Sequence, residues 1–318
     1  MDNAALDPEI AAFVAAMQQA WASHPPFMTL PLDEARGGAE QVRAPWRRGG
    51  PAMAATREHR IETAAGPLRI RIYDPGVASP APALLYLHGG GFTLFSIDTH
   101  DRLMREYAAA GGFLVVGVDY PLSPEARYPI ALDRTVGLID WLAAHGDTID
   151  VDARRLAIGG DSAGANIALA SALRLRDSGE PNRIRGLLLN YGGFGAPCSD
   201  DAEARFGGPG AVLDRAEMDY YFANYLGAPD RARDDPYARP ILADMAGLPP
   251  AFLVVPECDI LSEQSHAVHA AMRAAGCDVR AEVYAGATHS FLEAMSVAAV
   301  ARRAIADGAA FVTAKLAG

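Results

Sequence analysis

The chain has 318 residues, of which 50% are hydrophobic and 21% are charged. This composition is typical of a globular protein and excludes a disordered, collagen-like or repeat protein. The formal net charge is −11 and no run of Lys or Arg stands out, so we expect no nucleic-acid surface. Lys315 is the only lysine, which argues against P-loop nucleotide binding, Schiff-base chemistry and Ser–Lys dyads.

The cysteine content and the hydropathy pattern bear on the compartment. Cys198, Cys258 and Cys277 are an odd, unclustered set, which favours a reducing compartment over a zinc site or a disulfide framework. No apolar run approaches the ~20 residues that cross a bilayer. The N-terminal segment carries acidic residues before its first basic one, unlike a secretory signal. We therefore expect a cytoplasmic protein without a membrane span.

The N-terminal region combines one helical pattern with an irregular stretch. Apolar residues at helical spacing predict a helix over residues 7–22, with Asp7 as its N-cap and Pro8 at its first position. We expect this helix to pack on a core; the alternative is that it also covers a pocket. Residues 25–51 are rich in Pro, Gly and Arg, which predicts an irregular connection.

From residue 69 onwards, strand-like runs alternate with helical patterns. Strands are predicted at 69–73, 83–87, 113–118, 156–158, 186–189, 251–255 and 279–284, and helices at 101–111, 129–145, 163–176, 264–275 and 294–314. Continuous apolar runs indicate strands buried on both faces, whereas the alternating run at 279–284 indicates an edge strand. This order predicts an α/β fold with a doubly wound sheet and right-handed crossovers.

Residues 195–247 interrupt this alternation. They contain no strand-like run, but they hold several acidic residues and an aromatic cluster around Tyr220 and Tyr225. An insertion of this length between two strands is more typical of a lid or cap than of a loop.

The strongest chemical signal is a G-x-S-x-G motif from Gly160 to Gly164, which follows a predicted strand and opens a predicted helix. This context exposes the hydroxyl of Ser162 above the sheet, so we predict that Ser162 is a nucleophile. The amide of Ala163 lies at the helix N-terminus, where negative charge is favoured. The alternative is a glycine-rich turn without chemistry.

A second motif, His88-Gly89-Gly90-Gly91-Phe92, directly follows the strand 83–87. Consecutive glycines make backbone amides accessible, so we expect Gly90, Gly91 and Ala163 to form an oxyanion hole. A phosphate-binding loop is the alternative, although no G-x-G-x-x-G follows. His88 precedes the predicted donors, and we expect it to act as a structural hydrogen-bonding residue.

A nucleophilic serine needs a general base and an acid that orients it. His289 is the only histidine just after the last predicted strand, and Asp259 follows the strand 251–255. Glu257 is the local rival for the acid. His266 and His269 lie within a predicted helix; their spacing could suit a metal pair, but a third ligand is missing from the pattern, and we expect no metal.

These motifs resemble the hormone-sensitive-lipase-like group of α/β-hydrolase esterases, also called bacterial family IV. The resemblance covers roughly residues 60 to 315 and rests on HGGGF, VDYPLSPE, GDSAGAN, the D-x-L at Asp259 and the His289 element, in the expected order. The chain departs from the group at Pro121, where Arg is common, and at Ser262-Glu263-Gln264, where an Asp-Glu pair is usual.

The resemblance implies an α/β-hydrolase fold with a mostly parallel eight-stranded sheet, helices on both faces and a helical cap. The cap would comprise residues 1–50 and 195–247, and the catalytic domain would comprise 51–194 and 248–318. It also implies a serine carboxylesterase that acts on short- to medium-chain esters without metal or cofactor.

Several roles stay open at this stage. Phe92, Tyr191 and Tyr220 are candidate substrate-binding residues, although core packing explains them equally well. Asp161 adjoins the nucleophile, and we expect it to bond local amides rather than to act in catalysis. A non-catalytic ligand receptor, or a lactonase or amidase with the same triad, is an alternative function. The strand 279–284 could pair in a homodimer.

Overall fold

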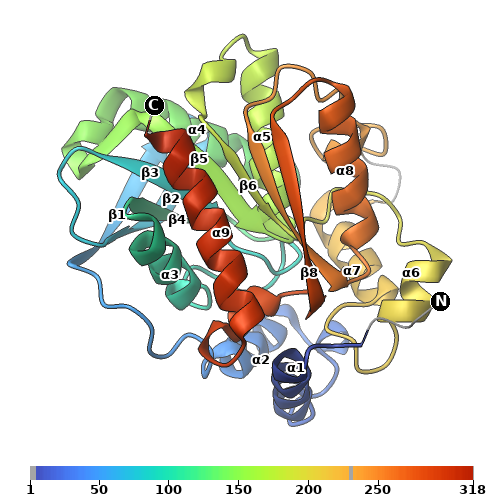
Figure 1. The fold of residues 1–318 in the computed structure, drawn as a ribbon. Coiled ribbons are helices and arrows are strands. Elements are labelled where there is room, and N and C mark those ends of the chain that lie inside the picture. Colours follow the sequence, from blue (N-terminus) through green and yellow to red (C-terminus); the bar gives the residue numbers. More distant parts are fainter. Residues whose placement is uncertain (1–4, 229–231, 318) are drawn as a thin grey trace.

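The structure is a computed structural model that describes residues 5–228 and 232–317, and eight strands within them form one sheet (Figure 1). The strands are β1 (Ala55–Thr63), β2 (Gly66–Asp74), β3 (Ala81–Leu87), β4 (Leu114–Asp119), β5 (Val151–Asp161), β6 (Leu187–Asn190), β7 (Ala251–Cys258) and β8 (Val279–Thr288). Their order is β1-β2-β4-β3-β5-β6-β7-β8. Only the β1–β2 and β2–β4 pairs among them are antiparallel. The predicted fold class is confirmed.

Alternate residues of the central strands pack into two different cores. In β3, Leu85 and Leu87 face the core that contains α4, α5 and α8, whereas Leu84 and Tyr86 face the core that contains α3 and α9. Both sets of side chains are fully buried. A strand covered on both faces has no solvent side, which is why its sequence is a continuous apolar run.

The helices form a layer on each face of the sheet (Figure 1). One layer contains α3 (Asp101–Gly111) and α9 (Ala299–Leu316), and the other contains α4 (Ile130–His145), α5 (Ala163–Asp177) and α8 (Ser262–Ala274). These elements confirm the helices predicted from the sequence, with ends that differ by a few residues. Among the described residues, no helix is both long enough and apolar enough to span a lipid bilayer.

Two elements escaped the sequence patterns. The prediction of an irregular connection over residues 25–51 is wrong, because Leu32–Arg43 forms helix α2. The buried face of α2 consists mostly of small residues, and two glycines lower its intrinsic helix propensity. Strand β1 was not predicted because it lies at the sheet edge and buries only its last few inward-facing side chains.

Two segments far apart in sequence lie beyond the carboxyl ends of the strands. Helix α1 (Pro8–Trp21) is anchored there by the hydrogen bond from Asp7 N to Gly286 O of β8, 3.0 Å long. Between residues 195 and 247, the described residues form α6 (Asp200–Phe206), α7 (Arg215–Leu226) and the 3-10 turn Pro240–Leu242, with no strand. In Figure 1 these helices lie together at one end of the sheet. The limits of the cap, residues 1–50 and 195–247, stay predictions. Residues 1–4 and 229–231 within these ranges lie outside the described residues.

Candidate active site

Ser162 lies in the tight turn between β5 and α5. Its backbone φ of +53° is in the left-handed region, which is unfavourable for any residue other than glycine. A Cβ on either Gly160 or Gly164 would overlap backbone atoms of Leu87 in β3. The turn is further fixed by a 2.9 Å hydrogen bond from Ser162 N to Asn190 O in β6. Contacts with β3 and β6 therefore hold the hydroxyl above the sheet.

The structure brings together the three predicted triad residues, which directly follow β5, β7 and β8. His289 Nε2 lies 3.0 Å from Ser162 Oγ, and His289 Nδ1 lies 2.8 Å from Asp259 Oδ2. The second carboxylate oxygen of Asp259 accepts a hydrogen bond from Leu261 N. His289 and Asp259 are 6% and 2% exposed, so the imidazole is held in a mostly dry setting. This geometry allows proton transfer from the serine to the histidine.

The rival residues lie elsewhere. Glu257 is exposed and accepts a 2.9 Å hydrogen bond from Gly286 N, while it is Asp259 that bonds His289. His266 and His269 are both on helix α8. Within residues 5–228 and 232–317, no group of three or more His, Cys, Asp or Glu side chains is arranged to hold a metal ion.

The glycine loop after β3 turns back on itself beside Ser162. Gly90 O accepts hydrogen bonds from Thr93 N and Leu94 N, at 3.0 and 2.8 Å. Gly90 and Gly91 have φ values of +115° and +59°, which suit glycine. Gly90, Gly91 and Ala163 border the same cavity as Ser162, so their amides are candidates to bind an oxyanion there.

His88 and Asp161 make contacts that fix the start of this glycine loop. His88 stacks on Tyr120 at 4.4 Å, and burial lowers the pKa of His88 to about 4, which keeps its ring neutral. Asp161 accepts hydrogen bonds from Gly89 N at 3.1 Å and from Tyr86 OH at 3.0 Å. These contacts agree with local structural roles for both residues.

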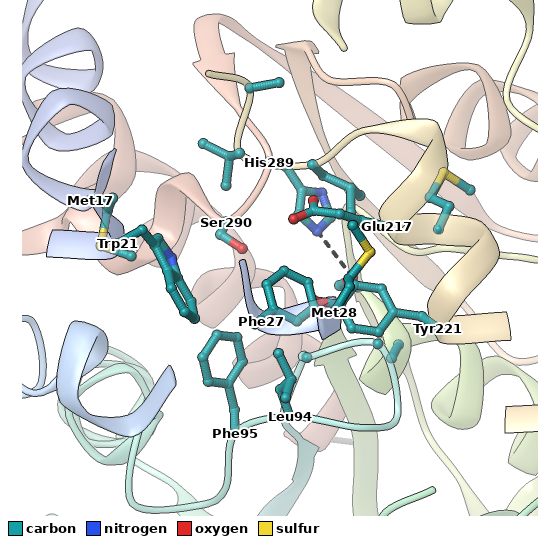
Figure 2. Close-up of a pocket in the computed structure, with 18 of the residues that line it drawn as sticks. Met17, Trp21, Phe27, Met28, Leu94, Phe95, Glu217, Tyr221, His289 and Ser290 are labelled. Carbon is teal, nitrogen blue, oxygen red and sulfur yellow. Dashed lines mark hydrogen bonds between the residues drawn. The ribbon is translucent and has the colours of Figure 1, made fainter. Parts of the chain in front are cut away.

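A cavity of about 420 Å³ opens above Ser162 (Figure 2). Its walls are mainly large apolar side chains from α1, the 3-10 turn Phe27–Thr29, the glycine loop and α7. They include Met17, Trp21, Phe27, Met28, Leu94, Phe95, Leu213, Met218, Tyr221 and Phe222. Such a lining suits an apolar substrate with few polar groups.

Of the three predicted substrate-binding residues, Phe92 lines this cavity. Tyr191 and Tyr220 are not among the described residues that line it. Tyr191 instead packs its ring against His289 at 5.2 Å, and Tyr220 packs edge-on against Phe27 at 5.8 Å. The neighbouring Tyr221 lines the cavity, so the sequence predicts the aromatic cluster but not the residue within it that faces inward.

Two charged residues of the wall also went unpredicted. Glu217 lies beside His289 in Figure 2, and burial together with Asp214 raises the pKa of its carboxyl to about 7. Arg43, the last residue of α2, lines the same cavity. Helical spacing could have placed Glu217, Met218 and Tyr221 on one face, but the pattern does not say that this face borders a cavity.

Comparison with known proteins agrees with the fold and the motifs. A family described as alpha/beta hydrolase fold matches residues 84–293. Acetyl esterases of Salmonella paratyphi A and Salmonella dublin are each 37% identical over 274 residues, which span 85% of this chain and 83% of the relative.

Solved structures of esterases superpose over nearly the whole chain. A hyperthermophilic esterase from the archaeon Pyrobaculum calidifontis has a TM-score of 0.90 at 30% identity and covers 98% of both chains. A thermostable carboxylesterase cloned from a metagenomic library has a TM-score of 0.85 at 32% identity and covers 90% of this chain and 98% of its own. The chain therefore belongs to the α/β-hydrolase fold family and, within it, to the hormone-sensitive-lipase-like esterases, and it is a carboxylic ester hydrolase.

Proposed function

We propose that the protein is a serine carboxylesterase that hydrolyses short- to medium-chain esters through an acyl-enzyme intermediate. The observation that carries this proposal is the chain of contacts from Ser162 Oγ through both nitrogens of His289 to Asp259. A hydroxyl with a base at 3.0 Å, and a carboxylate that orients the base, is the arrangement that nucleophilic acyl transfer requires.

In the first half of the reaction, Ser162 Oγ attacks the ester carbonyl while its proton moves to His289 Nε2. The carbonyl oxygen becomes an oxyanion that accepts hydrogen bonds from the amides of Gly90, Gly91 and Ala163. Asp259 stabilises the imidazolium. His289 then gives the proton to the leaving alcohol as the C–O bond breaks, which leaves the acyl group on the serine.

In the second half, water replaces the alcohol. His289 Nε2 takes a proton from the water as its oxygen attacks the acyl carbon. The second tetrahedral intermediate collapses, the bond from the acyl carbon to Ser162 breaks, and the proton returns to Ser162 Oγ. The carboxylic acid is released and the free enzyme is restored.

The Ser162→Ala variant tests the mechanism. We expect at least about a 10³-fold loss of kcat/KM on 4-nitrophenyl acetate, because loss of the nucleophile is among the largest single effects known. The wild type should bind a fluorophosphonate probe covalently at Ser162, and the variant should not. Ser171→Ala on the same helix is the matched control. Undiminished turnover by the Ser162 variant, with host esterase excluded, would refute the proposal.

The size of the cavity supports a preference for short acyl chains. Its volume of about 420 Å³ must hold both halves of the ester, and its apolar walls include bulky residues such as Trp21 and Tyr221. We expect kcat/KM on 4-nitrophenyl esters of two to sixteen carbons to be highest at the short end. A maximum at ten carbons or more would contradict this preference.

The alternative functions differ in what they predict. A non-catalytic receptor on this fold would fail to react with the fluorophosphonate probe, whereas a lactonase or amidase would react but prefer lactones or amides over esters. A cytoplasmic location and a homodimer through the β8 edge stay predictions from the sequence. Val283 on that edge is 46% exposed, which is compatible with pairing there.

A further inference from the structure

Arg43 is a charged side chain in the wall of the catalytic cavity that the proposed mechanism does not use. It is only 5% exposed, yet it is one of the residues that line the cavity. Its Nε and Nη1 atoms are buried and have no hydrogen-bond partner. Burial of guanidinium donors without partners is unfavourable, because they lose their hydrogen bonds to water.

The surroundings of Arg43 do not supply the missing partner. The nearest carboxylate is that of Glu293, whose Oε2 lies 3.9 Å from Arg43 Nη1, beyond hydrogen-bond distance. The other oxygen of Glu293 lies 3.4 Å from His100 Nε2, so this carboxyl group is shared. Burial raises the pKa of Glu293, which weakens it further as a counter-charge.

Arg36, on the same helix, shows what a structural arginine of α2 looks like. Its Nη1 and Nη2 donate to Glu125, each at 2.8 Å, while Nη2 also donates to Ser123 O and Nε donates to Thr93 O. Arg36 thus has a complete set of acceptors from the protein. The contrast indicates that Arg43 does not serve mainly to join α2 to the rest of the fold.

Arg43 lies close to the glycine loop and to the segment that follows His289. Its guanidinium lies 4.9 Å from the ring centre of Phe95, in the loop that carries Gly90 and Gly91. Glu293 lies in the 3-10 helix that begins two residues after His289. A group that reaches Arg43 from the cavity is therefore close to the elements that hold the oxyanion loop and the general base.

We infer that Arg43 is a subsite for a carboxylate carried by the ester substrate; this rests on the proposed function and specifies its substrate class. The planar guanidinium holds a carboxylate with a fork of two parallel N–H donors, which Nη2 forms together with either Nε or Nη1. Glu217 on α7 is the one carboxyl among the described residues that line the cavity, and it disfavours a second negative charge near it. The substrate carboxylate would thus be directed away from α7 and towards α2.

Two pairs of esters test this, each with a neutral compound of nearly the same shape. Monoethyl succinate and ethyl 4-methylpentanoate differ by a carboxylate in the acyl half, and acetoxyacetate and isobutyl acetate differ by a carboxylate in the alcohol half. In at least one pair, we expect the wild type to show a kcat/KM about 10-fold or more higher for the charged ester. The pair that responds identifies which half of the substrate reaches Arg43.

Variants of Arg43 separate recognition from catalysis. Arg43→Met should abolish the preference for the charged ester, measured as the ratio of kcat/KM between the two members of the pair, mainly through a higher KM for the charged one. Arg43→Lys keeps the charge but not the fork, so it should retain part of the preference. Arg47→Met, which removes a partly exposed arginine just beyond α2, is the control and should leave the preference intact.

Binding to the Ser162→Ala variant tests the subsite without turnover. By calorimetry, the charged ester of the responding pair should bind to Ser162→Ala more tightly than its neutral partner. In the double variant that also carries Arg43→Met, the two esters should bind equally. The inference is overturned if the wild type prefers the neutral ester in both pairs, or if Arg43→Met slows both members of a pair equally. Absence of turnover and of probe labelling in the wild type would instead refute the proposed function, and the binding comparison would still decide on the subsite.

Discussion

The floor and the walls of the catalytic cavity are built in different ways. The floor consists of Gly90, Gly91, Ser162, Ala163 and His289, and it is fixed by backbone conformations at the carboxyl ends of strands. The walls come from α1, the 3-10 turn Phe27–Thr29 and α7, and they are held by side-chain packing. Phe27, for example, stacks on Tyr221 at 5.9 Å with an angle of 14° between the rings.

This difference separates chemistry from selectivity. The floor turn around Ser162 lies against the backbone of β3 and β6, so a residue larger than glycine does not fit at positions 160 and 164. A wall residue mostly contributes apolar surface to the cavity, and another apolar side chain of similar size can replace it with a moderate loss of stability. We therefore expect floor substitutions to reduce kcat, and wall substitutions to redistribute activity among substrates.

Gly91→Ala tests the point where floor and wall meet, and it has the larger expected effect. A Cβ at position 91 would overlap the ring of Tyr221, and φ there is +59°. The loop must shift to relieve the overlap, which displaces the proposed oxyanion donors. We expect kcat on 4-nitrophenyl acetate to fall about 10²- to 10³-fold, as for the loss of one donor.

Two further variants identify the cause of that loss. Gly112→Ala is the matched control, because Gly112 has a φ of +63° but no heavy atom within 4 Å of the added Cβ; it should cost stability and not activity. Adding Tyr221→Ala to Gly91→Ala removes the overlap and should restore part of kcat. If Gly91→Ala retains near-wild-type kcat, the loop does not provide the oxyanion donors.

The same distinction explains what the sequence could predict. The residues of the floor carry local signals: glycines at fixed spacing around Ser162, three glycines after β3, and a single histidine after the last strand. These signals exist because the backbone there tolerates few residue types. The order of the apolar runs likewise predicts the sheet. A parallel strand that is buried on both faces has a continuous apolar sequence, because neither face can hold polar side chains.

The walls gave weaker signals for a physical reason. Which face of α7 borders the cavity depends on how α7 packs on the rest of the chain, so Tyr220 was predicted where Tyr221 lines the wall. Arg43 is a buried cation with two unsatisfied donors, and its counter-charge comes from Glu293, which is 250 residues further along the sequence. Such long-range relations leave no periodicity or motif in the local sequence.

Glu217→Gln is the most conservative test of the wall, and we expect its effect to be the smallest. Glu217 caps α7 reciprocally with Asp214: its carboxylate accepts from Asp214 N at 3.3 Å, and its own N donates to Asp214 at 2.8 Å. Glutamine preserves this capping box and removes only the ionisable group. Any pH-dependent difference between the two proteins therefore reports the charge of Glu217.

The sign of the stability effect follows from the raised pKa of Glu217, about 7 against an ordinary value of 4.5. Between these two values, the folded state keeps a proton that the unfolded state has released, so this group lowers stability as pH rises through that window. The Tm of the wild type should fall, relative to that of the variant, between about pH 4.5 and pH 7 and stay lower above it.

The kinetic effect has the opposite sign. Once ionised above about pH 7, Glu217 attracts the positive charge that His289 acquires in the transition state, so the wild type should gain on the variant by a few-fold in kcat/KM for a neutral ester. Glu203→Gln on α6 removes a carboxyl that does not line the cavity, and it should leave the pH profile of kcat/KM unchanged. The prediction is wrong if the wild type and Glu217→Gln show parallel pH profiles of both Tm and kcat/KM. Glu217 would then not titrate in this pH range, and its charge would not influence His289.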